Sequence, residues 1–382
     1  MDLNEIRGKL DTIDDSLTEL FVRRMALVGD VAEYKIKNSI PILNQGREDA
    51  IIERITAGLD ADTAQYVRML YANIFELSRA SQALRIAKAS QEPSAPCFVF
   101  SENAFPTDTK EAVACQGCEG ANSEAAAHAL FSSPNVRFYS TFEQVIRAVE
   151  SGESRFGLLP IENSLHGPVT AVYDLLKSSS VNIVRSIKIP IRHSLLAKKG
   201  VSVKDLKEIY SHEQALAQCA ERLHALPDVR LIPCENTAVA ARLVAESDRS
   251  DIAAVSSPQC AGLYGLGALE NDIQSNALNF TRFICICASP TVYKGADKVS
   301  LMFTVPNRPG MLFGVISRLA SAGINMTKIE SRPIPGTDFE FMFYVDIDAD
   351  PESQRLVDVL KTLSSALEQF KVLGGYSEVS AK

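Results

Sequence analysis

The chain has no excess of basic residues, no long apolar run and no regular cysteine framework, and each absence excludes a class of protein. Its 39 lysines and arginines stand against 47 acidic residues, which argues against a nucleic-acid partner. No apolar stretch reaches the roughly 18 residues of a membrane span, and residues 1–10 lack a signal-peptide core. The eight cysteines follow no disulfide spacing, which predicts reduced thiols in a cytoplasmic protein.

Signs of metal or cofactor chemistry are also scarce. Cys115 and Cys118 form one C-x-x-C pair, but no second pair with zinc spacing accompanies it. The five histidines show no spacing with carboxylates that marks a metal site. We therefore expect neither a metal nor a cofactor. What the chain does have is length, because 382 residues with 46% hydrophobic content predict about two to four domains.

The first predicted helix, over residues 3–34, carries an apolar seam with a seven-residue period. The seam consists of Leu3, Ile6, Leu10, Ile13, Leu17, Leu20, Leu27, Val31 and Tyr34. Arg24 occupies one seam position, where burial is costly unless an anion meets the guanidinium. A helix about 45–50 Å long cannot fold back within one small domain. We therefore expect the seam to close on a second chain in a homodimer.

Basic residues on this helix indicate what such a dimer could bind. Arg7 lies about 25 Å of helix away from Arg24, beyond the reach of one small ligand in one chain. An antiparallel partner helix would bring its own Arg7 beside Arg24 and Lys35, which together suit a dianion. Further helices are predicted over residues 45–57 and 62–89, and Ser78 and Gln82 share one face of the latter. The alternative for the basic residues is a solvated helix face with ordinary ion pairs, and the alternative for Ser78 and Gln82 is that both are polar residues in contact with water.

The middle of the chain alternates short apolar strands with helices, which predicts an α/β domain. After a linker over residues 91–111, with at most one short strand near Phe98, we expect one lobe built on parallel strands. A second lobe is expected to start with the strand 183–187, and the chain returns to the first lobe at 284–288, leaving a cleft between the lobes. Three loops stand out, over residues 116–123, 160–167 and 279–283. Taken singly, each is also explained as a tight turn, a capped turn or a routine strand.

The last region changes pattern again. The order strand, helix, strand, strand, helix, strand over residues 299–377 predicts a ferredoxin-like α+β sandwich. Residues 307–310 form a tight turn into its first helix, with backbone amides available for a carboxylate. The alternative is a generic appendage that holds a dimer together.

Residues 1–90 resemble the all-helical chorismate mutase domain. The match rests on seven residues at the family's spacing: Arg7, Arg24, Lys35, Arg47, Glu48, Ser78 and Gln82. The resemblance implies that Lys35 and Gln82 donate to the ether oxygen, that Arg24 and a partner's Arg7 clamp carboxylates, and that Glu48 accepts from the ring hydroxyl. Arg47 and Ser78 would support the clamp. Asn44 stands where the family commonly has Asp.

Residues 112–290 resemble prephenate dehydratase, whose two lobes form a periplasmic-binding-protein-like α/β domain. The match rests on residues 117–123, 160–167, 211–215 and 279–283, in family order. The resemblance implies that Thr281 is the donor to the leaving hydroxyl. It also implies that a set of polar residues lines the cleft: Glu162, Asn163, Ser164, Ser211 and Gln214. Asn122 stands where an aromatic residue is common.

Residues 297–378 resemble an ACT domain, a small amino-acid sensor. The matching segments are 310–313 and 330–333, which in dehydratases mark phenylalanine binding between paired ACT domains. The effector residues implied are Asn307, Pro309, Gly310, Leu312, Glu330, Ser331 and Arg332. If phenylalanine binds there, its binding and that of substrate are coupled reciprocally.

The three resemblances together predict a bifunctional enzyme of phenylalanine biosynthesis with a regulatory tail. It would convert chorismate to prephenate and prephenate to phenylpyruvate, and phenylalanine would inhibit it. Two alternatives stay open, namely arogenate dehydratase activity and a non-catalytic amino-acid sensor. Thr281 beside Glu162 and Asn163 favours catalysis over the sensor.

Overall fold

The structure is a computed structural model that describes residues 2–89, 98–308, 310–334, 336 and 340–381. The chain divides into two compact units. One comprises Met1–Cys97 with Val299–Val372, and the other comprises Phe98–Lys298 with Leu373–Lys382. The unit boundaries lie where the sequence pattern changes. The helical and the C-terminal α+β segments, which flank the α/β segment in the sequence, belong to one unit.

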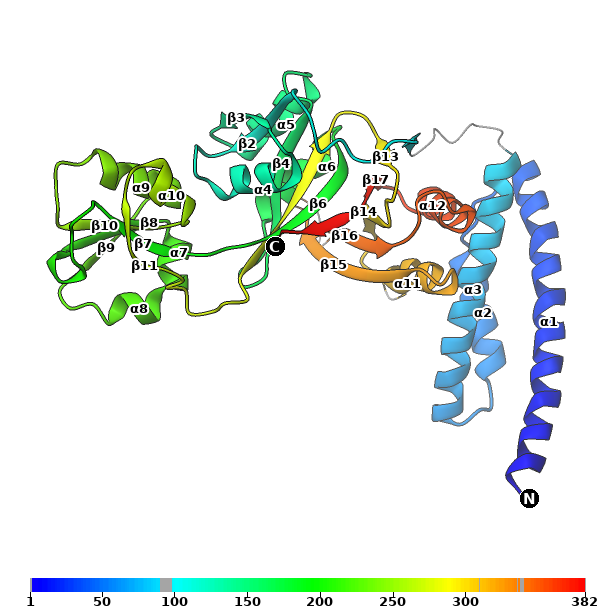
Figure 1. Cartoon of the computed structure of the whole chain (residues 1–382). Coiled ribbons are helices and arrows are strands. Elements are labelled where there is room, and N and C mark those ends of the chain that lie inside the picture. Colours follow the sequence, from blue (N-terminus) through cyan, green and yellow to red (C-terminus); the bar gives the residue numbers. More distant parts are fainter. Residues whose placement is uncertain (1, 90–97, 309, 335, 337–339, 382) are drawn as a thin grey trace. The chain divides into compact units, whose positions relative to one another are not determined.

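Three helices form the amino-terminal part: α1 (Leu3–Asn38), α2 (Gln45–Thr56) and α3 (Ala61–Ala89). Asp2 caps α1 by accepting a hydrogen bond from the backbone N–H of Glu5, and Ser39 ends it with a φ of 52°, two residues before Pro41. α1 and α3 lie side by side (Figure 1), with Val28, Gly29 and Ala32 of α1 buried. All three predicted helices are present with nearly the predicted bounds.

The C-terminal α+β segment has the predicted order of elements. It consists of β14 (Lys298–Val305), α11 (Met311–Ser321), β15 (Asn325–Pro333), β16 (Phe341–Asp348), α12 (Gln354–Ala366) and β17 (Phe370–Tyr376). The strands form one sheet in the order β15-β16-β14-β17, so that β15 and β17 are its edges. In the same unit, Arg318 of α11 forms an ion pair of 3.1 Å with Glu76 of α3.

The first lobe of the other unit is built on a seven-stranded sheet in the order β18-β6-β12-β4-β2-β3, with β5 paired to β4. Its strands are β2 (Ala112–Gln116), β3 (Asn135–Tyr139), β4 (Phe156–Asn163), β5 (Gly167–Pro168), β6 (Asn182–Pro190), β12 (Phe280–Cys287) and β18 (Glu378–Ser380). Its helices are α4 (Asn122–Leu130), α5 (Phe142–Glu150) and α6 (Thr170–Ser178). β1 (Val99–Ser101) pairs with β13 (Thr291–Tyr293) outside this sheet.

Two expectations for this lobe were wrong. The strand expected over residues 183–187 is β6, and it lies in the first lobe between β12 and β18 rather than in the second lobe. The sheet is also mixed, because β12 runs antiparallel to both β4 and β6. An apolar run is equally suited to either lobe, so periodicity could not assign β6.

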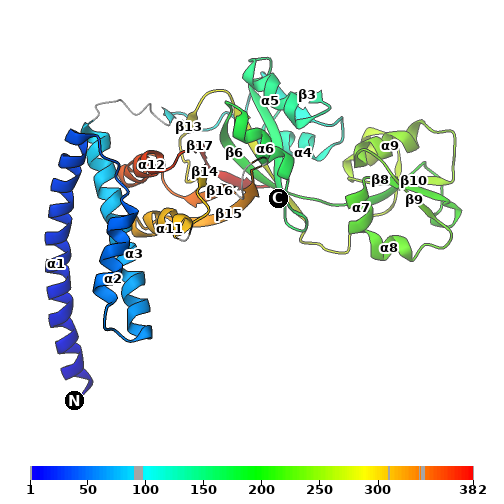
Figure 2. The same ribbon diagram turned by 180° about the vertical axis from the view of Figure 1, so that it is seen from behind.

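The second lobe carries a five-stranded sheet in the order β11-β7-β10-β8-β9. Its elements are β7 (Ser194–Ala197), the 3-10 turn Val203–Asp205, β8 (Glu208–Ser211), α7 (Glu213–Gln218), α8 (Ala220–His224), β9 (Arg230–Pro233), α9 (Thr237–Glu246), β10 (Ile252–Ser256), α10 (Gln259–Leu263) and β11 (Gly267–Glu270). Helices α9 and α10 cover one face and α7 and α8 the other (Figure 1; α7, α8 and α9 also in Figure 2), with a separate apolar core beneath each pair.

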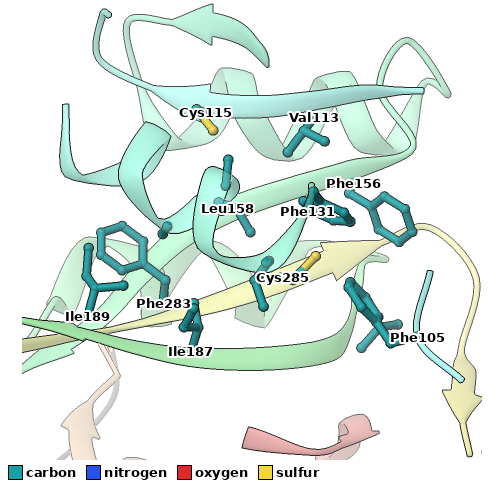
Figure 3. Packing of buried hydrophobic residues seen from close by; sticks show 14 of the residues in the cluster. Phe105, Val113, Cys115, Phe131, Phe156, Leu158, Ile187, Ile189, Phe283 and Cys285 are labelled. Atoms are coloured by element: carbon teal, nitrogen blue, oxygen red, sulfur yellow. The ribbon is translucent and has the colours of Figure 1, made fainter. Parts of the chain in front are cut away.

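The core of the first lobe lies between its sheet and α4. Phe105, Phe131 and Phe156 gather at one end of this core, with ring centroids 5.3–5.6 Å apart, and Phe283 and Ile189 lie at the other end (Figure 3). Phe283 also lines the cavity described below. Phe283, two residues after Thr281 on β12, therefore anchors this strand in the packed core at the wall of the cavity.

Candidate active sites

Five of the predicted mutase residues are brought together by α1, α2 and α3. Arg24 donates to the Ser78 hydroxyl at 2.5 Å, and its guanidinium lies over the ring of Phe75 at 5.9 Å. Ser78 and Gln82 are both buried, and the Gln82 amide donates to the backbone oxygen of Ser78 at 3.3 Å. The Gln82 Oε1 atom is buried without a hydrogen-bond partner. Oε1 can only accept, but the amide nitrogen carries two N–H groups, so that one remains to donate to a ligand beside the one used on Ser78.

Lys35 and Glu48 complete this group. The Lys35 ammonium donates to the backbone oxygen of Ile42 at 2.5 Å, and the Glu48 carboxylate accepts from Arg79 at 2.5 Å. Burial lowers the pKa of Lys35 and of Arg24, while the Glu48 charge acts in the opposite direction on both. The group thus holds two partly buried cations and one carboxylate, a charge pattern suited to an anionic ligand with a hydroxyl group.

Arg7 and Arg47 are not part of this group. Both side chains are exposed, and α1 runs without interruption from Leu3 to Asn38, so Arg7 stays about 25 Å along the helix from Arg24. Asn44, in place of the family's Asp, caps α2 by accepting from the Arg47 backbone N–H at 3.0 Å. Every apolar residue of the seam is exposed, from Leu3 (61%) to Tyr34 (64%).

A cavity of about 450 Å³ in the α/β unit brings together three of the predicted dehydratase residues, Asn163, Gln214 and Thr281. Its wall takes Asn163, Thr281 and Phe283 from the first lobe and Gln214, Gln218 and Asn236 from the second. Asn122 and Ser123, at the start of α4, also line it. Two lobes of one chain therefore enclose a mixed polar and apolar space of the size of a small ligand.

Thr281 and Asn163 face each other across the pairing of β12 and β4. The Asn163 side-chain amide donates to the Thr281 hydroxyl oxygen at 3.0 Å and to Asn279 Oδ1 at 2.8 Å. The Asn163 side-chain oxygen accepts from the backbone N–H groups of Leu165 and His166. Because Thr281 accepts in this contact, its own hydroxyl proton is left for another acceptor.

A second row of polar residues extends this pair. Gln218 Oε1 accepts from Asn279 at 3.0 Å and meets His193 Nε2 at 2.7 Å. His193 is buried, and burial lowers its pKa while Gln218 opposes the shift; its Nδ1 atom has no hydrogen-bond partner. Sequence reasoning missed Gln218 and His193. Gln218 lies four residues after Gln214 on α7, a spacing that places both side chains on one face of the helix. This spacing was the signal from which Gln218 could have been predicted.

Three residues expected to line the cleft do not line this cavity. Glu162 alternates with Asn163 along β4, and its carboxylate meets the buried Arg282 guanidinium at 3.4 Å. The Ser211 hydroxyl is fully buried and donates to the Val255 backbone oxygen, and the Ser164 hydroxyl donates to the Leu278 oxygen and accepts from the Phe280 N–H. These three side chains hold strands and loops in place behind the cavity.

The predicted effector residues lie at two places in the ACT segment. Asn307, Gly310 and Leu312 surround the start of α11, where Gly310 adopts a φ of 85°, which only glycine adopts readily. Glu330, Ser331 and Arg332 lie in β15, an edge strand, and Pro309 lies outside the described residues.

Other kinds of site find no support among the described residues. No cluster of three or more metal-binding side chains occurs there. None of the described helices combines the length and apolar character of a membrane-spanning segment. Cys115 of the C-x-x-C pair is buried, which raises the pKa of its thiol to about 12.

Comparisons with known protein families match this architecture. The family model of chorismate mutase type II matches residues 6–83, that of prephenate dehydratase residues 113–291, and that of the ACT domain residues 299–365. The fold and the sites thus define an enzyme with two catalytic parts and an ACT domain.

Individual relatives narrow this class. A bifunctional chorismate mutase/prephenate dehydratase of Aquifex aeolicus is 32% identical and covers 98% of each chain. Arogenate dehydratase 2 of Petunia hybrida is 38% identical over 69% of this chain and 71% of its own. The crystal structure of an Arthrobacter aurescens prephenate dehydratase in complex with L-Phe is 30% identical, with a TM-score of 0.63, over 70% of this chain and 90% of that one.

The chain belongs to the family of bifunctional chorismate mutase/prephenate dehydratases. It carries both activities and acts in phenylalanine biosynthesis. The expected family, fold class and activities are thereby confirmed.

Proposed function

We propose that the two reactions occur at two separate sites, with chorismate rearranged among α1, α2 and α3 and prephenate dehydrated in the cavity between the two lobes. The hydrogen bond of 3.0 Å from Asn163 to Thr281 in the cavity wall carries the second assignment. The contact of Arg24 with Ser78 supports the first.

The rearrangement is a concerted pericyclic shift, which needs neither a nucleophile nor a proton transfer. The protein accelerates it by holding the folded conformer and by stabilising the negative charge that grows on the ether oxygen. Lys35 and Gln82 donate to this oxygen, and Glu48 accepts from the ring hydroxyl. Arg24 clamps one carboxylate, and Ser78 orients its guanidinium.

The second carboxylate needs a further cation, and Arg7 of the partner subunit supplies it in a homodimer. The exposed apolar seam of α1 supports this arrangement, because a row of leucines and isoleucines 41–64% exposed is costly to leave in water. Arg47, close to the start of α2, supports the clamp from its exposed position.

In the dehydratase cavity, prephenate loses its ring hydroxyl as water and its ring carboxylate as carbon dioxide. Hydroxide is a poor leaving group, so Thr281 donates its hydroxyl proton toward it as the bond breaks. Asn163 orients Thr281. Gln214 and the free amides at the start of α4 receive a carboxylate, and Glu162, Ser164 and Ser211 keep the strands and loops behind Asn163 and Gln214 in register.

One assay tests both assignments. Purified enzyme receives chorismate, and prephenate and phenylpyruvate are followed together. Gln82→Ala should block prephenate formation while added prephenate is still consumed, and Thr281→Ala should let prephenate accumulate. Thr281→Ser keeps a hydroxyl and serves as the matched control. If Gln82→Ala and Thr281→Ala both retain both activities, the site assignments are wrong.

Arogenate is the second candidate substrate of the cavity. Arogenate dehydratase 2 of Petunia hybrida and an arogenate dehydratase/prephenate dehydratase of Arabidopsis thaliana are 38% and 37% identical over 69% of the chain. The Aquifex aeolicus bifunctional enzyme is 32% identical over 98% of the chain. We favour prephenate because the same chain produces it. The ratio of kcat/KM for the two substrates decides, and a higher value for arogenate reverses the assignment.

L-Phenylalanine is the proposed effector, bound by the ACT domain through residues near Gly310 and along β15. The Arthrobacter aurescens relative binds L-Phe, and an exposed edge strand suits a second ACT domain. Titrating L-Phe into the dehydratase assay should lower the rate. Gly310→Val, which cannot keep a φ of 85° without strain, should abolish this inhibition and leave the uninhibited rate unchanged.

The proposed compartment is the cytoplasm. The seven described cysteines are all free thiols, as a reducing compartment requires. Fractionation of cells that produce the chain, with dehydratase activity as the readout, tests this assignment.

A further inference from the structure

A short strand near the C-terminus, β18 (Glu378–Ser380), belongs to the seven-stranded sheet of the first lobe. β17 ends at Tyr376, and β18 then adds a parallel strand to β6, with Glu378 opposite Ser186 and Ser380 opposite Lys188. Gly374 has a φ of 152°, and the backbone of Ile183 occupies the space of a Cβ atom there. The C-terminal segment is therefore closely packed on β6 in this unit.

A buried arginine receives this segment. Arg282 is 7% exposed, and its guanidinium forms an ion pair of 2.6 Å with Glu378 and a hydrogen bond of 2.8 Å with the Tyr376 hydroxyl. Ser186 of β6 bridges the two, since it accepts from Arg282 at 3.0 Å and donates to Glu378 at 3.1 Å. Tyr376 and Glu378, both near the C-terminus of the chain, thus contact the Arg282 guanidinium.

Arg282 directly follows Thr281 in β12, and the two side chains point to opposite faces of the sheet. Thr281 lies opposite Asn163 of β4 and faces the cavity, whereas Arg282 lies opposite Glu162 and faces away from it. Asn163 and Glu162 alternate in the same way. Arg282, Glu162, Glu378 and Lys188 form a charged cluster on the face of the sheet opposite the cavity. This cluster contacts β12 and β4, the two strands that carry Thr281 and Asn163.

We propose that Glu378 is a positioning residue for the dehydratase reaction, which acts through Arg282 on the placement of Thr281 and Asn163. The proposal rests on the proposed role of Thr281. Glu378 does not line the cavity, so its carboxylate does not contact a substrate bound there.

The charge balance explains why Glu378 matters. The cluster contains two cations, Arg282 and Lys188, and two carboxylates, Glu162 and Glu378, with Lys188 and Glu378 2.8 Å apart. Removing the Glu378 charge leaves two cations against one carboxylate around a buried guanidinium. Arg282 then shifts toward water or toward Glu162, and either movement displaces β12 beside Thr281. Misplacement of a catalytic group by about 1 Å is sufficient for a loss of up to about 100-fold.

The test compares Glu378→Gln with the wild type in the full-length enzyme. We expect the dehydratase kcat to fall about ten-fold or more, with KM within about two-fold and the chorismate mutase rate unchanged. A loss of general stability would instead lower both activities together. Glu378→Asp keeps the charge and should recover part of the lost kcat. The matched control is Glu143→Gln, which removes an exposed carboxylate that pairs with Arg147 on α5.

Two results overturn the proposal. One is a Glu378→Gln enzyme with a kcat within two-fold of the wild type while Thr281→Ala is inactive. The other is equal loss of both activities. If Glu378→Gln does not fold, Tyr376→Phe removes only one hydrogen bond to Arg282 and should lower kcat by about two- to five-fold. An active Thr281→Ala enzyme, by contrast, refutes the underlying site assignment and not this proposal alone.

Discussion

The two candidate sites differ in whether a single chain supplies all of their residues. The cavity between the lobes is enclosed by residues of a single chain, and Thr281, Asn163, Asn279 and Gln218 are linked there by hydrogen bonds. The helical group has Arg24 beside Ser78, but Arg7 lies far along the same helix. A two-lobed domain can surround a ligand by itself, whereas a single long helix needs a second helix to do so.

The largest expected effect tests the need for a second chain. Leu17→Glu puts a charge in the seam and should prevent dimerisation through α1, because a carboxylate at an apolar contact is costly to desolvate. We expect a loss of about 100-fold in mutase activity with little change in dehydratase activity. Sedimentation and the two assays provide the measurement.

Val22→Glu is the matched control for the seam, because Val22 is 62% exposed on α1 and lies outside the seam. It should leave both the oligomeric state and the mutase activity unchanged. A fully active monomeric Leu17→Glu enzyme contradicts the shared site.

The next effect tests the completeness of the cavity within one chain. Gln218→Ala removes the acceptor of Asn279 and of His193, so Asn163 and Thr281 lose their support from the second lobe. The dehydratase kcat should fall by about ten-fold, because buried donors are left unsatisfied. Gln259→Ala, at an exposed position of α10, is the control. An unchanged kcat excludes a role for this row of hydrogen bonds.

A mixing experiment tests whether Arg7 and Arg24 of one mutase site come from two different chains. Arg7→Ala and Arg24→Ala chains should each lack mutase activity, but an exchanged dimer contains one intact site and one that lacks both arginines. Random exchange of equal amounts yields about one quarter of the wild-type activity, since half of the dimers are mixed and half of their sites are intact. Dehydratase activity should show no such recovery and no loss. Absence of any mutase recovery after exchange rules out a site shared in this way.

The smallest effect concerns acid stability of the cavity unit. Burial alone raises the pKa of Glu378, but Arg282 and Lys188 outweigh it, so that the pKa lies below the ordinary 4.5. The Glu378 carboxylate binds a proton more tightly in the unfolded chain than in the folded one. The contribution of Glu378 to the free energy of unfolding is therefore present above about pH 4.5 and is lost as the pH falls through the pKa of the folded state. Wild type and Glu378→Gln should differ in Tm by a few degrees at pH 7 and converge in acid. A gap that is constant with pH contradicts this linkage.

Sequence patterns predicted local structure well and the orientation of single side chains poorly. The seam period predicted α1 to within a few residues at its end, and the two segments that contain Asn163 and Thr281 were identified from the sequence. The family resemblance implied that Glu162 lines the cleft, but the alternation of side chains along β4 turns its carboxylate toward Arg282. β6 was assigned to the wrong lobe, because an apolar strand carries no information about its neighbours.

By itself, the sequence determined the three helices, the order of the three domains and the kinds of residue available for each reaction. Helical periods, prolines and charges act between residues close in the chain, so they can be read from it directly. Only the tertiary structure showed that Gln218 accepts a hydrogen bond from Asn279. It also showed that Glu378 forms an ion pair with Arg282, which lies far earlier in the chain and directly follows Thr281. Those contacts depend on which strands pair and in what register, and strand pairing follows from the packing of the whole unit.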